Sequence, residues 1–324
     1  MTEGPAVPEV LDGTASEPYD VLIIGGGPAG LSAALNLARS LARVLIVDAD
    51  RPRNAATINS HGFLTRDGIP PHELRKLARA ELADYPSVEI RTRQRVLSVA
   101  RTEDPDPLFT AWIGRTTATE TVQARAVLLA TGLRETLPEV PDLRGFYGMS
   151  LFSCAACDGF EMRDRPIALI GQSDDLADRA RLVARWSRDL TVFTHGAPVI
   201  DAVAEAELAA LGLTVERRPI RALIGEKGRL EAAELEDGTR IPLEGGFVRP
   251  EWSLDLGFLS GIDPQLDDGG HLITDGSGRT SERGLYAAGD AASPGPQQLI
   301  VAAGAGARAA AVIVHDSLGV TTAH

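Results

Sequence analysis

The chain has 324 residues, enough for two domains, and 44% of them are hydrophobic, which is ample material for two buried cores. Its formal net charge of -13 would repel nucleic-acid phosphates and anionic lipid, so neither nucleic acid nor a membrane surface is an expected partner. No uninterrupted apolar run reaches the roughly 20 residues that a bilayer span needs.

The first 18 residues are rich in Glu, Pro, Gly, Thr and Ser, a composition that predicts a flexible tail. They lack the basic start and the apolar centre of a secretory signal. We therefore expect a cytoplasmic protein that works in a reducing compartment.

A βαβ unit with a dinucleotide-binding glycine motif is predicted from Tyr19 onward. A buried strand over 21–24 leads into the motif over 25–30, which is followed by a helix to about residue 42 and a second strand over 44–47. In such a motif the first glycine allows a tight turn, the middle one admits a pyrophosphate, and the last lets the helix pack on the sheet. The helix N-terminus then offsets the phosphate charge. Asp48 ends the second strand, where a carboxylate accepts from ribose hydroxyls.

Three later segments are expected to return to the same cofactor. An apolar strand over 126–130 ends in the turn Thr131-Gly132, and a strand over 284–288 ends in Gly289-Asp290. Gly289 would bring a backbone amide near the ligand and Asp290 a carboxylate suited to a ribityl hydroxyl, although an ordinary strand and turn is the alternative. The Ala-rich segment 297–318 predicts a helix whose first N–H groups face an electron-rich ring edge.

The two cysteines of the chain, Cys154 and Cys157, form a Cys-Ala-Ala-Cys motif. Two thiolates cannot complete a four-cysteine zinc site, and Asp158 stands where c-type haem attachment requires histidine. In a reducing compartment a vicinal cysteine pair is more often catalytic than structural. Together with the glycine motif the pair indicates a flavin that exchanges electrons with a dithiol, whereas two inert buried thiols are the alternative. No metal site is expected.

A second βαβ unit, predicted over 167–193 with a helix over 176–186, lacks a nucleotide-binding motif. Gly171, Ser173 and Leu176 stand where three glycines would be needed. NADPH binding is therefore not expected to be tight.

The charges around this second unit also disfavour NADPH. Asp174 and Asp175 at its turn would repel a pyrophosphate, and His195 after its second strand is no bidentate partner for a 2′-phosphate. Arg217 and Arg218 are nearby in sequence, but a solvated strand edge also accounts for them.

The motifs, in order and spacing, resemble those of the low-molecular-weight thioredoxin reductases. They are the glycine motif 25–30, Ala130-Thr131-Gly132, the segment from Cys154 to Phe160, and Ala288-Gly289-Asp290. The resemblance covers nearly the whole chain from Tyr19. It implies an α/β homodimer of two Rossmann-like, doubly wound, three-layer domains: an FAD domain (19–137 and 247–324) and, inserted in it, a smaller NAD(P)-like domain (138–246) with the cysteines.

Other segments resemble the thioredoxin-reductase-like dithiol oxidases, the group that closes the disulfides of gliotoxin and holomycin. These segments are Arg53-Asn54-Ala55, the run from His61 to Pro71, and Arg185-Trp186. Gln297-Gln298-Leu299 stands where the reductases have Arg-Gln-Ala, and the basic NADPH cluster is missing. Asp158 is reductase-like, since several dithiol oxidases have histidine there. His61 could contact flavin or substrate, and a loop histidine bonded to backbone is the alternative.

The motifs and the resemblance together predict one set of FAD-binding residues. They are Gly25, Gly26, Gly27, Pro28, Ala29, Gly30, Asp48, Arg53, Asn54, His61, Val96, Ala130, Thr131, Gly132, Gly289, Asp290, Gln297, Gln298 and Leu299.

Our hypothesis is that a substrate dithiol is oxidised by the cysteine pair, that the electrons pass to FAD, and that dioxygen accepts them to give hydrogen peroxide. The resemblance implies that Cys157 lies against the flavin and that Cys154 faces the substrate. Asp158 is the predicted proton carrier, provided that burial raises its pKa from about 3.9, although it would also serve as a helix cap.

Two other functions remain open. The first is an NADPH- or ferredoxin-fed reductase of thioredoxin or a related carrier, and the second is a flavin redox sensor without turnover. A small-molecule dithiol and a thioredoxin-like protein need the same sulfurs, so the sequence leaves the substrate undetermined.

Overall fold

The computed structural model describes residues 17–103, 106–292 and 295–320, so the tail predicted over 1–18 lies almost wholly outside them. Contacts divide the chain into two compact units. Unit 1 comprises residues 1–52, 72–133 and 253–324, and unit 2 comprises 53–71 and 134–252. Unit 2 thus contains residues 53–71 in addition to the segment predicted as the insert. The assignment of unit 1 as the FAD domain and of unit 2 as the inserted domain stays a prediction.

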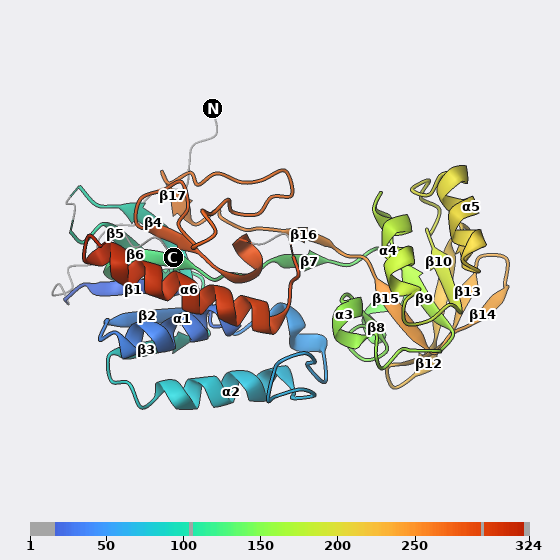
Figure 1. The fold of residues 1–324 in the computed structure, drawn as a ribbon, viewed down its shortest axis with the longest axis horizontal. Coiled ribbons are helices and arrows are strands. Elements are labelled where there is room, and N and C mark those ends of the chain that lie inside the picture. The colour runs from blue at the N-terminus through green and yellow to red at the C-terminus, as the bar shows by residue number, and fades with distance from the viewer. Residues whose placement is uncertain (1–16, 104–105, 293–294, 321–324) are drawn as a thin grey trace. The chain divides into compact units, whose positions relative to one another are not determined.

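Unit 1 is built on an eight-stranded mixed sheet with the order β17-β4-β5-β6-β1-β2-β3, in which β18 pairs with β6 (Figure 1). Parallel pairing joins β1 to β2 and to β6, whereas β5 runs antiparallel to β4 and β6. The strands are β1 (Tyr19–Ile24), β2 (Val44–Asp48), β3 (Val88–Thr92), β4 (Arg95–Arg101), β5 (Phe109–Gly114), β6 (Ala118–Leu129), β17 (Leu259–Ser260) and β18 (Leu285–Ala287). The predicted α/β class is confirmed.

The central strands of unit 1 are buried on both faces. Val21 and Ile23 of β1 belong to a cluster with helices α1 (Pro28–Arg39) and α6 (Leu299–Ser317), whereas Leu22 and Ile24 belong to a cluster on the other face. A strand covered on both sides needs a continuous apolar run, which is the pattern of 21–24. The other helices of unit 1 are α2 (Pro71–Leu82) and the short η3 (Gly289–Ala292).

Helix α6 is long and apolar enough to cross a bilayer by length and composition, although Arg308 interrupts its apolar run. Its Gly306, Ala309 and Ala310 are nevertheless buried, and they belong to the face that packs toward α1. A Cβ on Gly306 would lie 2.0 Å from Ala29 O, so the two helices approach closely. The face of α6 that carries these residues therefore forms part of the core of unit 1.

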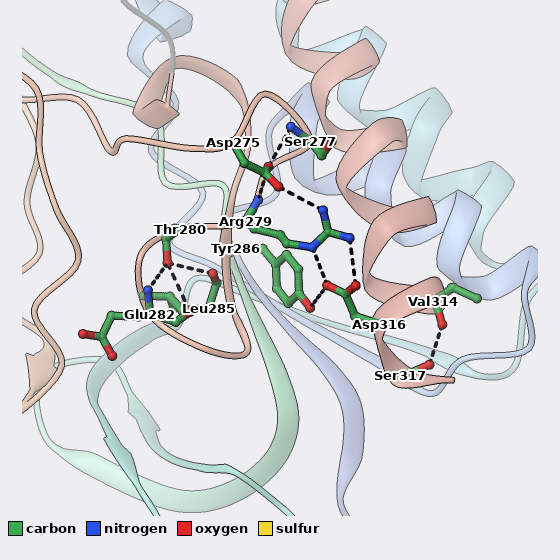
Figure 2. Close-up of polar contacts among 10 residues, drawn as sticks. All are labelled: Asp275, Ser277, Arg279, Thr280, Glu282, Leu285, Tyr286, Val314, Asp316 and Ser317. Carbon is green, nitrogen blue, oxygen red and sulfur yellow. Dashed lines mark hydrogen bonds and ion pairs between the residues drawn. The ribbon is translucent and has the colours of Figure 1, made fainter. Parts of the chain in front are cut away.

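The C-terminal end of α6 is fixed by a polar network in unit 1 (Figure 2). Arg279 donates from Nε and Nη2 to the two carboxylate oxygens of Asp316, each at 2.8 Å, and from Nη1 to Asp275 Oδ2 at 2.9 Å. The hydroxyl of Tyr286, from β18, donates to Asp316 Oδ2 at 2.8 Å. The network ties α6 to the sheet by a bidentate pair, the strongest geometry for arginine and carboxylate.

Unit 2 contains a five-stranded parallel sheet with the order β11-β10-β9-β15-β8, a three-stranded sheet β12-β13-β14 and the pair β16-β7. The strands are β7 (Arg134–Thr136), β8 (Leu151–Phe152), β9 (Ile167–Ile170), β10 (Leu190–Phe193), β11 (Thr214–Glu216), β12 (Ile220–Glu226), β13 (Arg229–Leu235), β14 (Arg240–Pro242), β15 (Gly245–Val248) and β16 (Glu251–Ser253). The helices are η1 (Arg53–Ala56), η2 (Leu143–Gly145), α3 (Ala155–Asp158), α4 (Leu176–Val183) and α5 (Ala202–Ala210). The second βαβ unit, β9-α4-β10, is therefore present as predicted.

Candidate cofactor and dithiol sites

The glycine motif forms the turn between β1 and α1. Gly25 has φ +112°, and a Cβ there would lie 2.3 Å from Ala130 O. A Cβ on Gly30 would lie 2.0 Å from Gly25 O. Both positions therefore exclude larger residues, the first because of its conformation and the second because of the close packing of helix on turn.

Gly27 differs from its neighbours because a Cβ there would meet nothing within 4 Å among the described residues. Gly27 is the N-cap of α1, and its backbone is extended. As a glycine it has no side chain that could accept hydrogen bonds from the first N–H groups of the helix. The first N–H groups of a helix lack partners within the helix, and the macrodipole is positive at this end. Open space beside such a terminus fits a pyrophosphate.

Asp48, at the end of β2, lies against this turn. A Cβ on Gly26 would stand 2.5 Å from Asp48 Oδ2. That same oxygen accepts a hydrogen bond from Arg79 Nη2 at 2.7 Å, and Oδ1 accepts from Asp50 N at 3.1 Å. Each carboxylate oxygen has two lone pairs, so capacity for ribose hydroxyls is left. Arg79 was not expected at this site, because residues 49–70 separate its helix α2 from β2 and nothing local in the sequence pairs Arg79 with Asp48.

The segments predicted to return to the cofactor are also in unit 1. Ala130, Thr131 and Gly132 follow β6 directly, and a Cβ on Gly289 would lie 2.9 Å from Ala29 Cβ of α1. Asp290 is in η3, and Val96 is a core residue of β4, 7% exposed.

Gln297 stands just before α6, followed by the N-cap Gln298 and by Leu299, the first residue of the helix. Both side-chain amide atoms of Gln297 are buried, and the described residues give them no hydrogen-bond partner. Buried amides are nearly always paired, and a bound polar ligand would supply the partner that Gln297 lacks among the described residues. The open space at Gly27, the carboxylate at Asp48 and this orphaned amide fit FAD.

Three of the residues predicted to bind FAD are grouped elsewhere. Arg53, Asn54 and His61 belong by their contacts to unit 2, together with the cysteines, and not to unit 1 with the glycine turn. Their contact with FAD therefore stays a prediction.

The cysteine motif forms a single helical turn in unit 2. Cys154 and Cys157 are joined by a disulfide, with their Cα atoms 5.3 Å apart. Cys154 is the N-cap of α3, and its carbonyl oxygen accepts from the N–H groups of Cys157 and Asp158 at 3.2 and 3.1 Å. A Cβ on Gly159 would lie 2.6 Å from the Trp186 ring, so the turn packs tightly on that residue.

Asp158 is buried, with 8% of its surface exposed. Burial raises the pKa of its carboxyl to about 7; among its neighbours, His61 lowers this pKa and Glu161 raises it. A group with that pKa both accepts and returns protons near neutral pH, which is the condition set for a proton carrier. Glu161, three residues after Asp158, was not singled out from the sequence, although that spacing is a signal that was available.

The turn after β9, where NADPH would need glycines, is filled by side chains of unit 2. A Cβ on Gly171 would lie 2.7 Å from Leu176 Cδ1 and 2.8 Å from Arg249 Cβ. Arg249 Nε donates to both carboxylate oxygens of Asp175 at 3.0 Å, and Arg179 Nε donates to Asp175 Oδ2 at 3.0 Å. Burial would raise the pKa of Asp175, but hydrogen bonds from Arg249, Ser173 and Arg179 lower it to about 2.

The basic side chains near this turn are engaged by the protein itself. The Arg249 guanidinium lies 4.5 Å from the centre of the Trp252 ring. Arg217 pairs with Glu205 at 2.7 Å, and Arg218 with Glu216 at 2.6 Å. His195 Nδ1 accepts from Ile220 N at 2.9 Å.

Comparisons with known proteins agree with this geometry. A model of the pyridine nucleotide-disulphide oxidoreductase family matches residues 19–306. The thioredoxin reductase of Mycolicibacterium smegmatis is 30% identical over 91% of this chain and 96% of its own length. A probable thioredoxin reductase of Arthroderma benhamiae is 33% identical, but the match spans only 55% of this chain and 44% of the relative.

Solved structures match over nearly the full chain. The putative thioredoxin reductase TrxB from Bacillus anthracis superposes with a TM-score of 0.84 at 37% identity, covering 93% of this chain and 99% of that one. HlmI superposes with a TM-score of 0.88 at 33% identity, covering 95% of each chain. This chain therefore belongs to the pyridine nucleotide-disulphide oxidoreductase family and is one of its thioredoxin reductase-like, FAD-binding members.

Proposed function

We propose that this protein is an FAD-dependent dithiol oxidase, which closes a disulfide in its substrate and reduces dioxygen to hydrogen peroxide. The observation that carries the proposal is the filled turn at Gly171, because by resemblance an NADPH-fed reductase would bind its NADPH at this turn. The alternative, a reductase that acts on a thioredoxin-like protein, is favoured by the names of the relatives.

The contrast between the two glycine turns supports the oxidase. A side-chain atom added at Gly27 would meet open space, whereas one added at Gly171 would meet Leu176 and Arg249. Asp175, the N-cap of α4, places a negative charge where a pyrophosphate would need the positive helix end. Binding NADPH would require moving Arg249 and breaking its bidentate pair with Asp175.

In the proposed reaction the residues of unit 2 perform the exchange. A substrate thiol gives its proton to the Asp158 carboxylate and, as a thiolate, attacks Cys154 Sγ. The bond between Cys154 and Cys157 breaks, and the leaving Cys157 sulfur takes the proton from Asp158. The second substrate thiol then displaces Cys154, which yields the substrate disulfide and two protein thiols. Bound FAD would accept the two electrons of this cysteine pair and deliver them to dioxygen.

Anaerobic stopped-flow spectroscopy tests the direction of electron flow. We expect dithiothreitol, as a model dithiol, to bleach the flavin absorbance of the holoprotein, and an equal concentration of NADPH to leave it unchanged over the same time. Admitting air should restore the colour and give about one hydrogen peroxide per dithiol oxidised. Rapid bleaching by NADPH would overturn the oxidase in favour of the reductase.

Two variants serve as controls for the sulfur pathway. Cys154→Ser and Cys157→Ser should each abolish bleaching by dithiothreitol and keep the flavin bound, because neither cysteine is among the predicted FAD-binding residues. If either variant retained the wild-type bleaching rate, electrons would reach the flavin without the disulfide. The same assay with a reduced thioredoxin in place of dithiothreitol separates a protein substrate from a small one.

A further inference from the structure

The loop that carries His61 is held against the segment that leads to the cysteines. Ile58 N donates to Gly148 O at 3.3 Å, and a Cβ on Gly148 would lie 2.2 Å from Ala56 O. The two backbones therefore touch within unit 2. This contact brings His61 to the cysteine turn although more than 90 residues separate them in the sequence.

The imidazole ring of His61 has a carboxylate on each side. Its Nδ1 lies 3.6 Å from Asp67 Oδ1, and its Nε2 lies 3.8 Å from Glu161 Oε1. Asp67 is fixed because the same oxygen accepts from Gly62 N at 2.8 Å. The other carboxylate oxygen of Glu161, Oε2, is buried and has no hydrogen-bond partner among the described residues.

Asp158 is subject to the charges of both His61 and Glu161. The positive charge of a protonated His61 favours the Asp158 carboxylate, whereas the negative charge of Glu161 favours its neutral carboxylic acid. The Asp67 carboxylate lies at Nδ1 of His61, whereas Glu161 lies at Nε2. The Arg163 guanidinium is engaged by Phe160, since it lies 4.0 Å from the ring centre and donates to Phe160 O.

We propose that His61 and Glu161 are an opposed pair of positioning residues that sets the proton occupancy of Asp158 during dithiol–disulfide exchange. His61 holds Asp158 as the carboxylate that takes a proton from the substrate thiol. Glu161 favours the carboxylic acid that returns this proton to the leaving sulfur. The role in turnover rests on the proposed function, but the charge relation belongs to the resting protein as well.

Infrared spectroscopy of the oxidised holoprotein measures this relation without turnover. The carbonyl stretch of a protonated carboxyl group is recorded against pH, and the band that Asp158→Asn removes is assigned to Asp158. We expect His61→Gln to move the midpoint of this band upward and Glu161→Gln to move it downward, each by roughly half a pH unit or more. Opposite signs are the decisive result, because a general loosening of the turn would move both midpoints in one direction.

Three further variants complete the experiment. His72→Gln and Glu236→Gln remove the same groups at exposed positions that are not among the neighbours shifting the pKa of Asp158, and they should leave the midpoint unchanged. His61→Lys restores a positive charge and should return the midpoint to the wild-type value or below. If His61→Gln does not fold, the downward shift expected of Glu161→Gln decides the matter. A midpoint that does not fall in Glu161→Gln, or that does not rise in a folded His61→Gln, would overturn the proposal.

The pH dependence of flavin bleaching by dithiothreitol then connects the pair to catalysis. Its acidic limb should move in the same directions as the infrared midpoint. If the two infrared midpoints shift in opposite directions but no dithiol reduces the flavin, the proposed oxidase is refuted and the charge pair stands. Normal dithiol oxidation without the opposed infrared shifts would refute the pair and leave the oxidase.

Discussion

Asp158 makes the protein less stable at neutral and higher pH than at acidic pH. Burial raises the pKa of this carboxyl from 3.8 to about 7, so the folded protein binds its proton more tightly than the unfolded chain does. This tighter proton binding stabilises the folded protein in full only below the pKa of the unfolded chain. The stabilisation is lost as pH rises from about 4 to about 7. Above pH 7 the folded protein therefore holds a buried negative charge at a cost.

Replacing this carboxyl by a neutral amide should relieve that cost. We expect Asp158→Asn to raise the free energy of unfolding at pH 8 by roughly 2–4 kcal/mol, and at pH 4 by much less. Urea titrations of the oxidised protein at the two pH values measure this difference. A gain that is the same at both would show that packing, and not ionisation, is responsible. The same variant should slow dithiol exchange, because it has lost the proton acceptor.

At the residue scale the sequence predicted those site residues that are neighbours in the chain. Cys154, Cys157 and Asp158 were found together because one helical turn contains them. The contact of His61 with Glu161 and that of Arg79 with Asp48 were not foreseen, since each joins distant segments. No single sequence carries a local signal for such pairs.

At the element scale, the turn between β1 and α1 separates two roles of glycine. A methyl group at Gly30 would lie 2.0 Å from Gly25 O, whereas one at Gly27 would meet nothing among the described residues. Gly30→Ala should therefore destabilise unit 1 itself, by about 1–3 kcal/mol. Gly27→Ala should leave the apoprotein as stable as wild type and weaken FAD binding at least tenfold, because the methyl group enters the space assigned to the pyrophosphate.

Thermal unfolding of the apoproteins and fluorescence titration with FAD separate these effects. If the Gly27→Ala protein bound FAD normally, the pyrophosphate would not lie at this turn. Equal destabilisation by both substitutions would mean that the loop tolerates no side chain anywhere.

Element bounds followed from periodicity with small errors. In the first βαβ unit the predicted strands match β1 and β2 closely, because clear Gly and Pro signals bound their apolar runs, whereas the helix predicted to about residue 42 ends at Arg39. The helix predicted over 176–186 ends at Val183 instead. Arg185 and Trp186 donate to carbonyls three residues back, so the chain tightens into a turn there. Because Trp186 is apolar, it continues the helical pattern in the sequence. In the structure its ring packs on Gly159, and the sequence does not distinguish this contact from a place in a helix.

At the scale of the whole molecule, the fold class was predictable and the grouping of 53–71 was not. Alternating strands and helices with a glycine turn specify an α/β fold with parallel strand pairs, such as β1 with β2. The loop 53–71 carries no regular periodicity, and its assignment to unit 2 depends on tertiary contacts such as that of Ile58 with Gly148.

Two units with separate cores should unfold in two steps. Unit 1 has its own apolar clusters on the two faces of its main sheet, and unit 2 has two others around its parallel sheet. Trp112 lies in unit 1, whereas Trp186 and Trp252 lie in unit 2. A Trp112→Phe variant therefore reports on unit 2 alone, and a Trp186→Phe, Trp252→Phe double variant reports on unit 1 alone.

Binding to one unit stabilises that unit by mass action, by about 2.7 kcal/mol when the free ligand is at 100 times its Kd. FAD should accordingly raise the melting temperature that Trp112 reports by several degrees, while the transition that Trp186 and Trp252 report moves less. At the same FAD concentration Gly27→Ala should reduce the first shift to about half or less, since its turn is the assigned pyrophosphate site. A single transition common to both reporters, moved equally by FAD, would mean that the two units unfold as one cooperative body and that the cores are not independent.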